Sequence, residues 1–342
     1  MSSCTVTMRF ADSAQREIIV APGANLLDAA LAAGVELVHQ CRTGSCGTCI
    51  CRRLNGAVPM VASTSVALLP TERADGHILS CLTRVESDAI VEFPYESSVL
   101  DRNPAVTFEA EIVEIERLSA SVVRLTVEAI NEAPDFLPGS YFMLEVPDAG
   151  VARAYSPYTR SEDLPTLSFL MRLLPGGVMS TFLDRAEPGD VLKIEGPFGE
   201  FHWRQTMAPL VLIAGGTGVA PILSILDTIA AERRHRERIL LCMGVNTEED
   251  MFFLDELALR EQLMPRLEVR VAVASQGSTW QGAVGHVTHL VTDADLSAEC
   301  CAYLCGPPPM VAEAVRLLTA AGVSEQNIHF EKFNPAIPEI AA

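Results

Sequence analysis

The chain has 342 residues, of which 49% are hydrophobic, so it is long enough to form two or three domains that each bury an apolar core. Its formal net charge of −19 is spread along the chain without a stripe of Lys and Arg, which argues against the basic surface that nucleic-acid binding requires. The longest apolar run is far shorter than the ~18 residues of a membrane span and the sequence opens on no signal-peptide-like segment, so we expect a cytoplasmic protein without a membrane anchor.

The first hundred residues predict a small mixed domain over residues 1–100. Strand-like runs precede an amphipathic stretch that begins at Asn25, a residue suited to helix capping, and ends at Gly34. The last strand-like run, residues 89–95, leads into the polar segment 96–104. We expect this segment to be a linker, because it is polar and ends in proline.

Four cysteines of this region follow the ligand spacing of a plant-type [2Fe-2S] cluster. Cys41, Cys46 and Cys49 form C-x4-C-x2-C, and Cys81 follows 32 residues after Cys49. A cluster needs four soft thiolates, and glycines in the loop let backbone amides approach the sulfurs. In a reducing compartment, metal ligation, catalysis or burial explains ten cysteines better than disulfides do.

A zinc site is the alternative for these cysteines. Zinc motifs usually pair C-x2-C with a second short pair, whereas Cys81 stands alone, so we favour the cluster. Cys51 is expected to pack beside the cluster loop. No role is assigned to the remaining strand cysteines, because buried thiols are common in strands: Cys4, Cys242, Cys300 and Cys301.

Repeated strand patterns predict an antiparallel β-barrel over residues 101–206. Within it, the segment RAYS, residues 153–156, sets an aromatic ring beside an arginine, which offers a stacking face and a charge for a phosphate. The segment PGGVMSTF, residues 175–182, places two glycines and a Ser-Thr pair ahead of a short helix, as anion-binding loops do. A simple hairpin turn is the alternative for these glycines.

Strand-like and helical runs alternate over residues 207–342, which predicts a parallel α/β sheet. A buried strand runs into GGTG, residues 215–218, and a helix then opens with Pro221 in its first turn. Such glycines let a diphosphate approach the backbone, and the helix N-terminus favours its negative charge. The segment therefore predicts a dinucleotide site, although it lacks the common G-x-G-x-x-G pattern.

Two further features lie at the ends of predicted strands in this sheet. Glu248, Glu249 and Asp250 follow the second strand, where carboxylates suit a free ribose hydroxyl and repel a 2′-phosphate, which favours NADH over NADPH. A solvent-exposed helix start explains each of them equally well. Cys305 and Gly306 end another strand, at the edge where ligands of parallel sheets bind, although the cysteine could also be a core residue.

Taken in order, these motifs resemble the ferredoxin-NAD(P) reductase superfamily with a plant-type ferredoxin at the N-terminus, over nearly the whole chain. The resemblance is strongest to the reductase components of benzoate, toluate and anthranilate ring-hydroxylating dioxygenases, which share an ending similar to NIHFEKF. It implies a β-grasp (α+β) ferredoxin domain at 1–100, an FAD-binding antiparallel barrel at 101–206, and an α/β parallel-sheet NAD-binding domain with a C-terminal tail at 207–342. Relatives with a C-terminal ferredoxin generally carry FMN, whereas this domain order, with GGVMST, implies FAD.

The resemblance also implies roles for matching residues. The catalytic set is Ser156, Cys305 and Glu331, and Phe333 matches the aromatic residue that covers the flavin. Because nine residues follow Phe333, Phe330 is an alternative for that aromatic. The FAD-binding set is Arg153, Ala154, Tyr155, Ser156, Gly177, Val178, Met179, Ser180 and Thr181. The NADH-binding set is Gly216, Thr217, Gly218, Pro221, Cys305, Gly306 and Pro307, to which the charge argument adds Glu248 and Asp250.

This combination predicts an NADH-dependent electron-transfer reductase. A nicotinamide gives two electrons as hydride, whereas a [2Fe-2S] cluster accepts one at a time, so FAD must stand between them. The expected acceptor is a terminal oxygenase that hydroxylates aromatic rings. Alternatives are the reductase of a diiron monooxygenase or of a deoxysugar dehydratase, and, more remotely, a redox sensor without turnover.

Overall fold

The computed structural model describes residues 3–39, 42, 44, 47–61, 68, 70–97, 100, 105–147, 149–275, 277 and 279–333. By contacts between residues, the chain divides into two compact units, one within residues 1–104 and the other spanning Ala105–Phe333. The predicted linker at 96–104 falls at this division, but much of it lies outside the described residues. No helix in the described part of the chain is long and apolar enough to cross a membrane.

The first unit is built on a five-stranded sheet in the order β2-β1-β7-β4-β5. Its strands are β1 (Cys4–Arg9), β2 (Gln15–Val20), β4 (Ile50–Asn55), β5 (His77–Leu79) and β7 (Ala89–Glu92). β1 and β7 pair in parallel, and the other pairs are antiparallel. A second pair of short strands, β3 (Ala24–Asn25) and β6 (Arg84–Val85), and the helices α1 (Leu26–Ala32), α2 (Pro70–Ala74) and η1 (Ser80–Leu82) complete it.

Alternation of buried and exposed residues explains how this sheet meets α1. On β1, Val6 and Met8 are fully buried, and they share one core with Leu26 and Leu27 of α1. The predicted helix start is confirmed, because the Asn25 side chain accepts a hydrogen bond from the Asp28 amide at the N-cap. The first unit therefore buries one face of its sheet against a capped helix.

Residues 105–203 of the second unit form six antiparallel strands in the order β11-β10-β13-β8-β9-β12. They are β8 (Val106–Arg117), β9 (Val122–Ala129), β10 (Tyr141–Val146), β11 (Val151–Tyr155), β12 (Thr166–Arg172) and β13 (Val191–Phe198). A bridge between Pro157 and Phe169 joins the chain after β11 to β12, the strand at the other edge. A short helix, α3 (Val178–Leu183), follows β12, as the sequence predicts.

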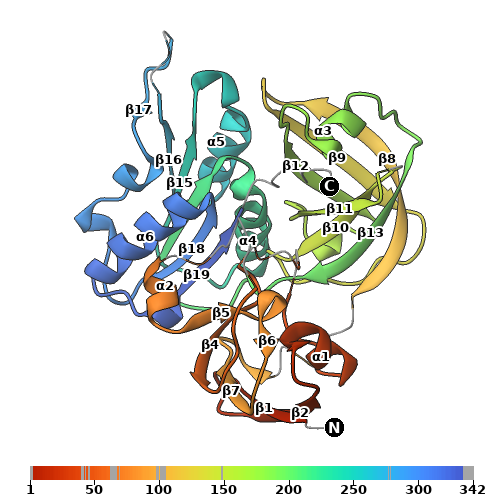
Figure 1. Cartoon of the computed structure of the whole chain (residues 1–342). Helices are drawn as coiled ribbons and strands as arrows, with labels where there is room; N and C mark the ends of the chain where they lie inside the picture. The colour runs from red at the N-terminus through yellow and green to blue at the C-terminus, as the bar shows by residue number, and fades with distance from the viewer. Residues whose placement is uncertain are drawn as a thin grey trace. The chain divides into compact units, whose positions relative to one another are not determined.

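The rest of the second unit contains a six-stranded parallel sheet in the order β17-β16-β15-β14-β18-β19 (Figure 1). Its strands are β14 (Leu210–Gly215), β15 (Ile239–Val245), β16 (Leu267–Val273), β17 (Ala283–Val284), β18 (Cys301–Gly306) and β19 (Ile328–Lys332). Its longer helices are α4 (Val219–Glu232), α5 (Leu254–Leu263) and α6 (Pro308–Ala320).

Both faces of this parallel sheet are buried, which explains why its strands read as continuous apolar runs. Leu212 of β14 shares one core with Ile222 of α4, whereas its neighbour Ile213 shares another with Val311 of α6. Side chains at the carboxyl ends of β14 and β18 are therefore held from both sides. The helix α5 was not predicted from the sequence, because its charged residues weaken the apolar pattern.

Candidate functional site

Two of the four predicted cluster ligands lie side by side in the first unit. Cys49 precedes β4 and Cys81 lies in η1, and their Sγ atoms are 3.2 Å apart. Both side chains are buried, and the Ser80 amide donates to the Cys49 carbonyl at 2.9 Å, which holds the two segments together. The other two predicted ligands, Cys41 and Cys46, lie outside the described residues.

The surroundings of this cysteine pair fit an iron-sulfur cluster. The Ser80 hydroxyl, next to Cys81, is fully buried and has no hydrogen-bond partner in the described part of the chain. A buried polar atom of this kind needs a partner that the described residues do not supply, such as a water, an ion or a bound polar group. At Gly44, with φ +83°, a Cβ would lie 2.3 Å from Leu82 Cδ1, so the backbone at Gly44 lies tightly against the side chain that follows Cys81.

Cys51 belongs to the packing of the first unit. It lies on β4, is 1% exposed, and is part of the same core as the residues of β1 and α1. Burial, with a contribution from Cys49, raises the pKa of its thiol well above the ordinary value. Its position therefore agrees with the predicted packing role.

The segment RAYS lies at the end of β11, on the wall of the antiparallel sheet. Tyr155 packs against the core of that sheet, and Arg153 donates from Nη1 to the Ala152 carbonyl at 3.0 Å. Burial raises the pKa of the Tyr155 phenol, and the charge of Arg153 partly offsets this rise. An aromatic ring and a guanidinium group thus stand two residues apart on one strand, where they can stack on a ring and bind a phosphate.

Ser156 joins the antiparallel sheet to the last strand of the parallel sheet. Its Oγ donates to Oε2 of Glu331 at 3.4 Å, across 175 residues of sequence. Burial raises the pKa of Glu331 to about 8, although the bond from Ser156 partly lowers it. The carboxyl group is therefore able to hold a proton at neutral pH.

Cys305 is the third member of this group. It is the last residue but one of β18, lies directly opposite Glu331 of β19 in the strand register, and is fully buried. Burial, with a contribution from Glu331, raises the pKa of its thiol well above the ordinary value, so the thiol stays neutral. The fold thus brings Ser156, Cys305 and Glu331, the predicted catalytic residues, to one place.

The predicted diphosphate loop of the antiparallel sheet opens the helix α3. Gly177 is the N-cap of α3, and the Thr181 amide donates to its carbonyl at 2.8 Å. Ser180 Oγ accepts a bond from the Leu174 amide at 2.8 Å, which closes the loop on itself. Met179 is buried, whereas Val178 is exposed. The short helix is confirmed, and the contact with a diphosphate stays a prediction.

The two glycine-containing loops of the parallel sheet pack on each other. A Cβ at Gly218 would lie only 2.3 Å from the carbonyl oxygen of Cys305, so the GGTG loop requires glycine at this position. Thr217 and Gly216 precede it in a 3-10 turn, and Pro221 lies in the first turn of α4. Because β14 and β18 are neighbours, both loops lie at their carboxyl ends, where nucleotides bind to such sheets.

The acidic residues after β15 are engaged by the chain itself. Asp250 accepts hydrogen bonds from Ser121 Oγ and, at 3.0 Å, from Thr247 Oγ1. Burial raises the pKa of Asp250, but these hydrogen bonds together lower it by more. The pKa of this carboxyl therefore lies below its ordinary value. Glu248 accepts a bond from the Thr279 hydroxyl, which lowers the pKa of that carboxyl. Their predicted contact with a ribose therefore stays a prediction.

The two candidate aromatic residues near the C-terminus differ in their surroundings. Phe333 is partly buried, packs against the core that contains Cys305, and donates from its amide to the Gly306 carbonyl at 2.8 Å. Phe330 is 46% exposed, and the Lys332 ammonium lies 5.2 Å from its ring centroid. Phe333 therefore packs with the core around Cys305, whereas Phe330 faces solvent, which favours Phe333 as the aromatic residue predicted to lie beside the flavin.

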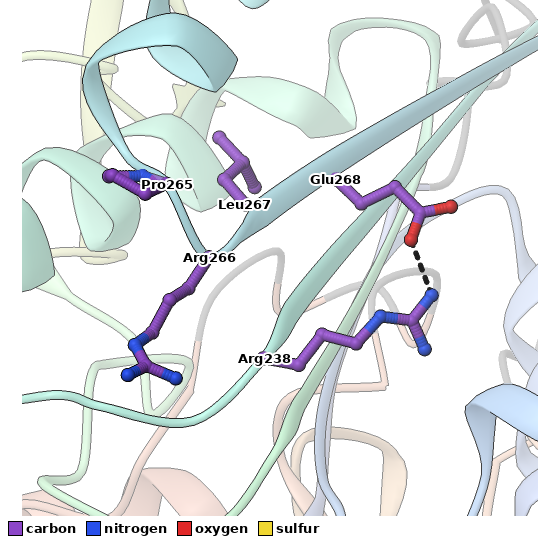
Figure 2. A pocket seen from close by; sticks show the side chains of 5 residues that line it. All are labelled: Arg238, Pro265, Arg266, Leu267 and Glu268. Atoms are coloured by element: carbon purple, nitrogen blue, oxygen red, sulfur yellow. Dashed lines mark hydrogen bonds and ion pairs between the residues drawn. The ribbon is translucent and has the colours of Figure 1, made fainter.

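A pocket of about 340 Å³ lies at the opposite edge of the parallel sheet, where β15 and β16 begin (Figure 2). It is lined by Arg238, Pro265, Arg266, Leu267 and Glu268. Arg238 binds Glu268 at 2.5 Å and Asp295 at 2.7 Å. These ion pairs tie neighbouring elements together at the amino ends of the strands, away from the edge where the predicted nucleotide residues gather.

Three residues form hydrogen bonds at the site that were not predicted from the sequence. Asn25 donates from Nδ2 to the Cys81 carbonyl at 2.7 Å, in addition to capping α1. Ser121 and Thr279 bind the acidic residues after β15. The capping preference of Asn25 is visible in the sequence, but nothing in the sequence indicates that its amide reaches a cysteine 56 residues away.

Comparison with known proteins assigns a family to each part of the chain. The model of the 2Fe-2S iron-sulfur cluster binding domain matches residues 10–86, and that of the oxidoreductase FAD-binding domain matches residues 109–203. The model of the oxidoreductase NAD-binding domain matches residues 212–316. The residues matched include Cys41 to Cys81, the RAYS and GGVMST segments, and both glycine loops of the parallel sheet.

Similar proteins share this arrangement over almost their whole length. The toluate 1,2-dioxygenase electron transfer component of Pseudomonas putida is 35% identical over 96% of this chain and 98% of its own. The anthranilate 1,2-dioxygenase electron transfer component of Acinetobacter baylyi is 34% identical over 96% and 97%. Among solved structures, an Amycolatopsis cytochrome P450 reductase matches 96% of this chain and 99% of its own, with a TM-score of 0.75 and 29% identity. The chain therefore belongs to the ferredoxin-NAD(P) reductase superfamily, in the family of electron transfer components that join an N-terminal 2Fe-2S domain to FAD-binding and NAD-binding oxidoreductase domains.

Proposed function

We propose that this chain is the NADH-dependent reductase of a terminal oxygenase that hydroxylates aromatic rings. One observation carries the proposal: the fold brings Ser156, Cys305 and Glu331 together at the carboxyl edge of the parallel sheet, within a chain that also pairs buried cysteines. Electron-transfer components of toluate and anthranilate dioxygenases are similar over nearly the full chain, which supports this acceptor class.

Bound FAD would accept a hydride from NADH and pass on electrons singly. The chain's own residues bind and orient the reactants. Arg153 would neutralise a phosphate and Tyr155 would stack on the flavin, with Phe333 covering the ring. Glu331 would hold a proton that Ser156 relays, because burial keeps the carboxyl largely protonated near neutral pH. Cys305, as a neutral buried thiol, would orient the nicotinamide.

The remaining predicted residues complete the proposal. Cys41, Cys46, Cys49 and Cys81 would ligate the cluster, as the spacing and the Cys49–Cys81 contact support. The segments 177–181 and 216–221 would bind the two diphosphates through backbone amides and hydroxyls, and Pro307, Glu248 and Asp250 would flank the NADH. Three domains, a β-grasp ferredoxin at 1–100, a flavin-binding barrel at 101–206 and an α/β domain at 207–342, would carry the three groups.

A different acceptor is the second candidate. The likeness to an Amycolatopsis cytochrome P450 reductase favours it, because similar modules there serve a different kind of oxygenase. We place the protein in the cytoplasm, where a [2Fe-2S] cluster and reduced thiols persist. In both candidates the electrons would leave through the same cluster. Only the identity of the oxygenase that accepts them therefore distinguishes the two.

The test is to purify the chain with FAD, iron and sulfide supplied, and to measure reduction of cytochrome c with NADH and with NADPH. The proposal expects a yellow-brown protein that turns over with NADH and much more slowly with NADPH. A second measurement supplies a Rieske-type aromatic-ring oxygenase or a cytochrome P450 as the acceptor. A protein that stays colourless, or one that binds both groups without turnover, overturns the proposal, and the latter result indicates a sensor.

A further inference from the structure

We propose that Asn25 is a positioning residue for the iron-sulfur cluster, because its side chain ties the start of α1 to the predicted ligand Cys81. Its Oδ1 accepts from the Asp28 amide at 3.1 Å, and its Nδ2 donates to the Cys81 carbonyl at 2.7 Å. One amide group thus joins two segments that are 56 residues apart. The inference rests on the proposed function, in which Cys81 binds the cluster.

The backbone on both sides of this contact is held in place. Asn25 pairs with Arg84 in the short β3–β6 ladder, and the Leu26 amide donates to the Thr83 carbonyl at 3.0 Å. The Thr83 hydroxyl in turn donates to the Leu79 carbonyl at 2.8 Å, which closes the turn around Cys81. Asn25 therefore acts from a fixed position, so that its amide orients the Cys81 peptide instead of following it.

The chemistry of asparagine makes this double contact possible. A helix N-cap needs only an acceptor, and serine or aspartate supplies one as well as asparagine does. Asparagine alone among these also carries two N–H donors on a separate atom, which here reach a carbonyl that the helix does not use. The capping contact and the ligand-holding contact are therefore separable by substitution.

A group that forms a hydrogen bond with a metal-ligating residue, without touching the metal itself, contributes strongly to metal retention. Loss of such a partner typically costs ~10–100-fold in metal affinity. Without the Asn25 amide, the Cys81 peptide gains freedom, and the thiolate leaves the cluster more readily. We expect the rate of cluster loss to rise by about tenfold, the lower end of this range.

The experiment compares Asn25→Ser and Asn25→Asp in the full, FAD-loaded and cluster-loaded chain. Both variants keep an oxygen for the cap and lack the amide donor. Bleaching of cluster absorption in excess EDTA gives the loss rate, and visible circular dichroism reports the geometry around the cluster. Thermal unfolding of the cluster-free chains measures the cap separately. Both variants should bleach about tenfold faster with an altered dichroism spectrum, while the cluster-free midpoint falls only by the small amount expected for the loss of one hydrogen bond.

Ser87→Ala is the matched control. Ser87 accepts a bond from the Ala57 amide at 2.9 Å in the same unit, and no hydrogen bond joins it to a cysteine in the described part of the chain. Its loss should lower the cluster-free midpoint and leave the bleaching rate and dichroism unchanged. Wild-type bleaching and dichroism in both Asn25 variants overturn this inference alone. A wild-type chain that never acquires a cluster overturns the proposed function instead.

Discussion

Burial changes the chemistry of single residues at the predicted flavin site. The Glu331 carboxyl, ordinarily ionised at neutral pH, has its pKa raised to about 8, because the low-polarity surroundings disfavour its charge. The thiol of Cys305 is kept neutral by burial, with a contribution from Glu331. Two groups that would be charged or reactive in water are therefore both protonated beside Ser156.

Replacing Glu331 with glutamine should remove a pH dependence of stability. The pKa of this carboxyl is about 8 in the fold against 4.5 for an ordinary glutamate, so between these values the folded chain binds more protons. The free energy of unfolding of the wild type should therefore fall as pH rises from about 5 to 8, by at most ~1.4 kcal/mol per pH unit from this group. Urea titrations followed by tryptophan fluorescence report on this unit, since Trp203 and Trp280 both lie in it.

In Glu331→Gln the free energy of unfolding should change less between pH 5 and pH 8 than it does in the wild type. At pH 8 the variant should be as stable as the wild type, or more stable. The two curves running parallel from pH 5 to 8 would show that Glu331 is ionised at the same pH in both states. That result would remove the proton-holding role proposed for it.

Cys305→Ala should slow the reduction of bound flavin by NADH by about tenfold, while FAD and cluster remain bound. The substitution keeps a small apolar residue at the end of β18 and removes only the sulfur that would orient the nicotinamide, and loss of orientation lowers the rate. Stopped-flow bleaching of the flavin measures the rate. Cys242→Ala is the control, because Cys242 is equally buried but faces the α6 side of the sheet. Equal rates in wild type and Cys305→Ala would contradict the assignment.

At the scale of elements, the predicted nucleotide site depends on how closely two loops approach. The GGTG turn and the end of β18 belong to different βα units, and β14 and β18 bring them together as neighbouring strands. Their contact leaves no room for a Cβ at Gly218, whereas a Cβ at Gly216 would point into open space. The loop therefore needs glycine for two different reasons, close packing at one position and a positive φ at the other.

Gly218→Ala should destabilise the second unit by ~1–3 kcal/mol and weaken reduction by NADH, because the new methyl group would meet backbone atoms of Cys305 that cannot move aside. Gly216→Ala, at φ +54°, should cost only ~1 kcal/mol, since its strain is conformational and local. Thermal unfolding and NADH titration of the flavin distinguish the two. If Gly218→Ala unfolds at the wild-type midpoint, the loops are not in the contact described.

At the scale of the whole molecule, electron entry and electron exit belong to different compact units. Residues 1–104 contain the paired cysteines, and Ala105–Phe333 contains both the predicted flavin and the predicted nucleotide residues. Each unit has a core of its own. Damage to the cluster site should therefore leave hydride transfer in the other unit intact.

Cys81→Ser should abolish the visible absorption of the cluster, yet the chain should still reduce ferricyanide with NADH at close to the wild-type rate. Ferricyanide takes electrons directly from flavin, whereas reduction of cytochrome c, which depends on the cluster, should fall by more than about tenfold. Cys51→Ser is the control and should keep the cluster, because Cys51 is a packing residue. Cluster absorption that persists in Cys81→Ser excludes Cys81 as an essential ligand.

Much of the fold was predictable from local patterns. The Asn25 cap, the apolar runs of the parallel sheet and the short helix after Gly177 are set by residues within a few positions of one another, and all are observed. The helix α5 was missed because its charged residues hide the apolar period. The acidic residues after β15 show the same limit, since their partner Ser121 comes from a different part of the chain.

The sequence by itself determined the spacing of the cysteines, the order of the three modules and the glycines that nucleotide loops require, because each of these depends on local covalent spacing and backbone conformation. Only the tertiary structure decided that Ser156 meets Glu331 and that Asn25 reaches Cys81. These contacts arise when separate elements bury their apolar faces together, and no local period of the sequence specifies which distant polar groups that packing makes neighbours.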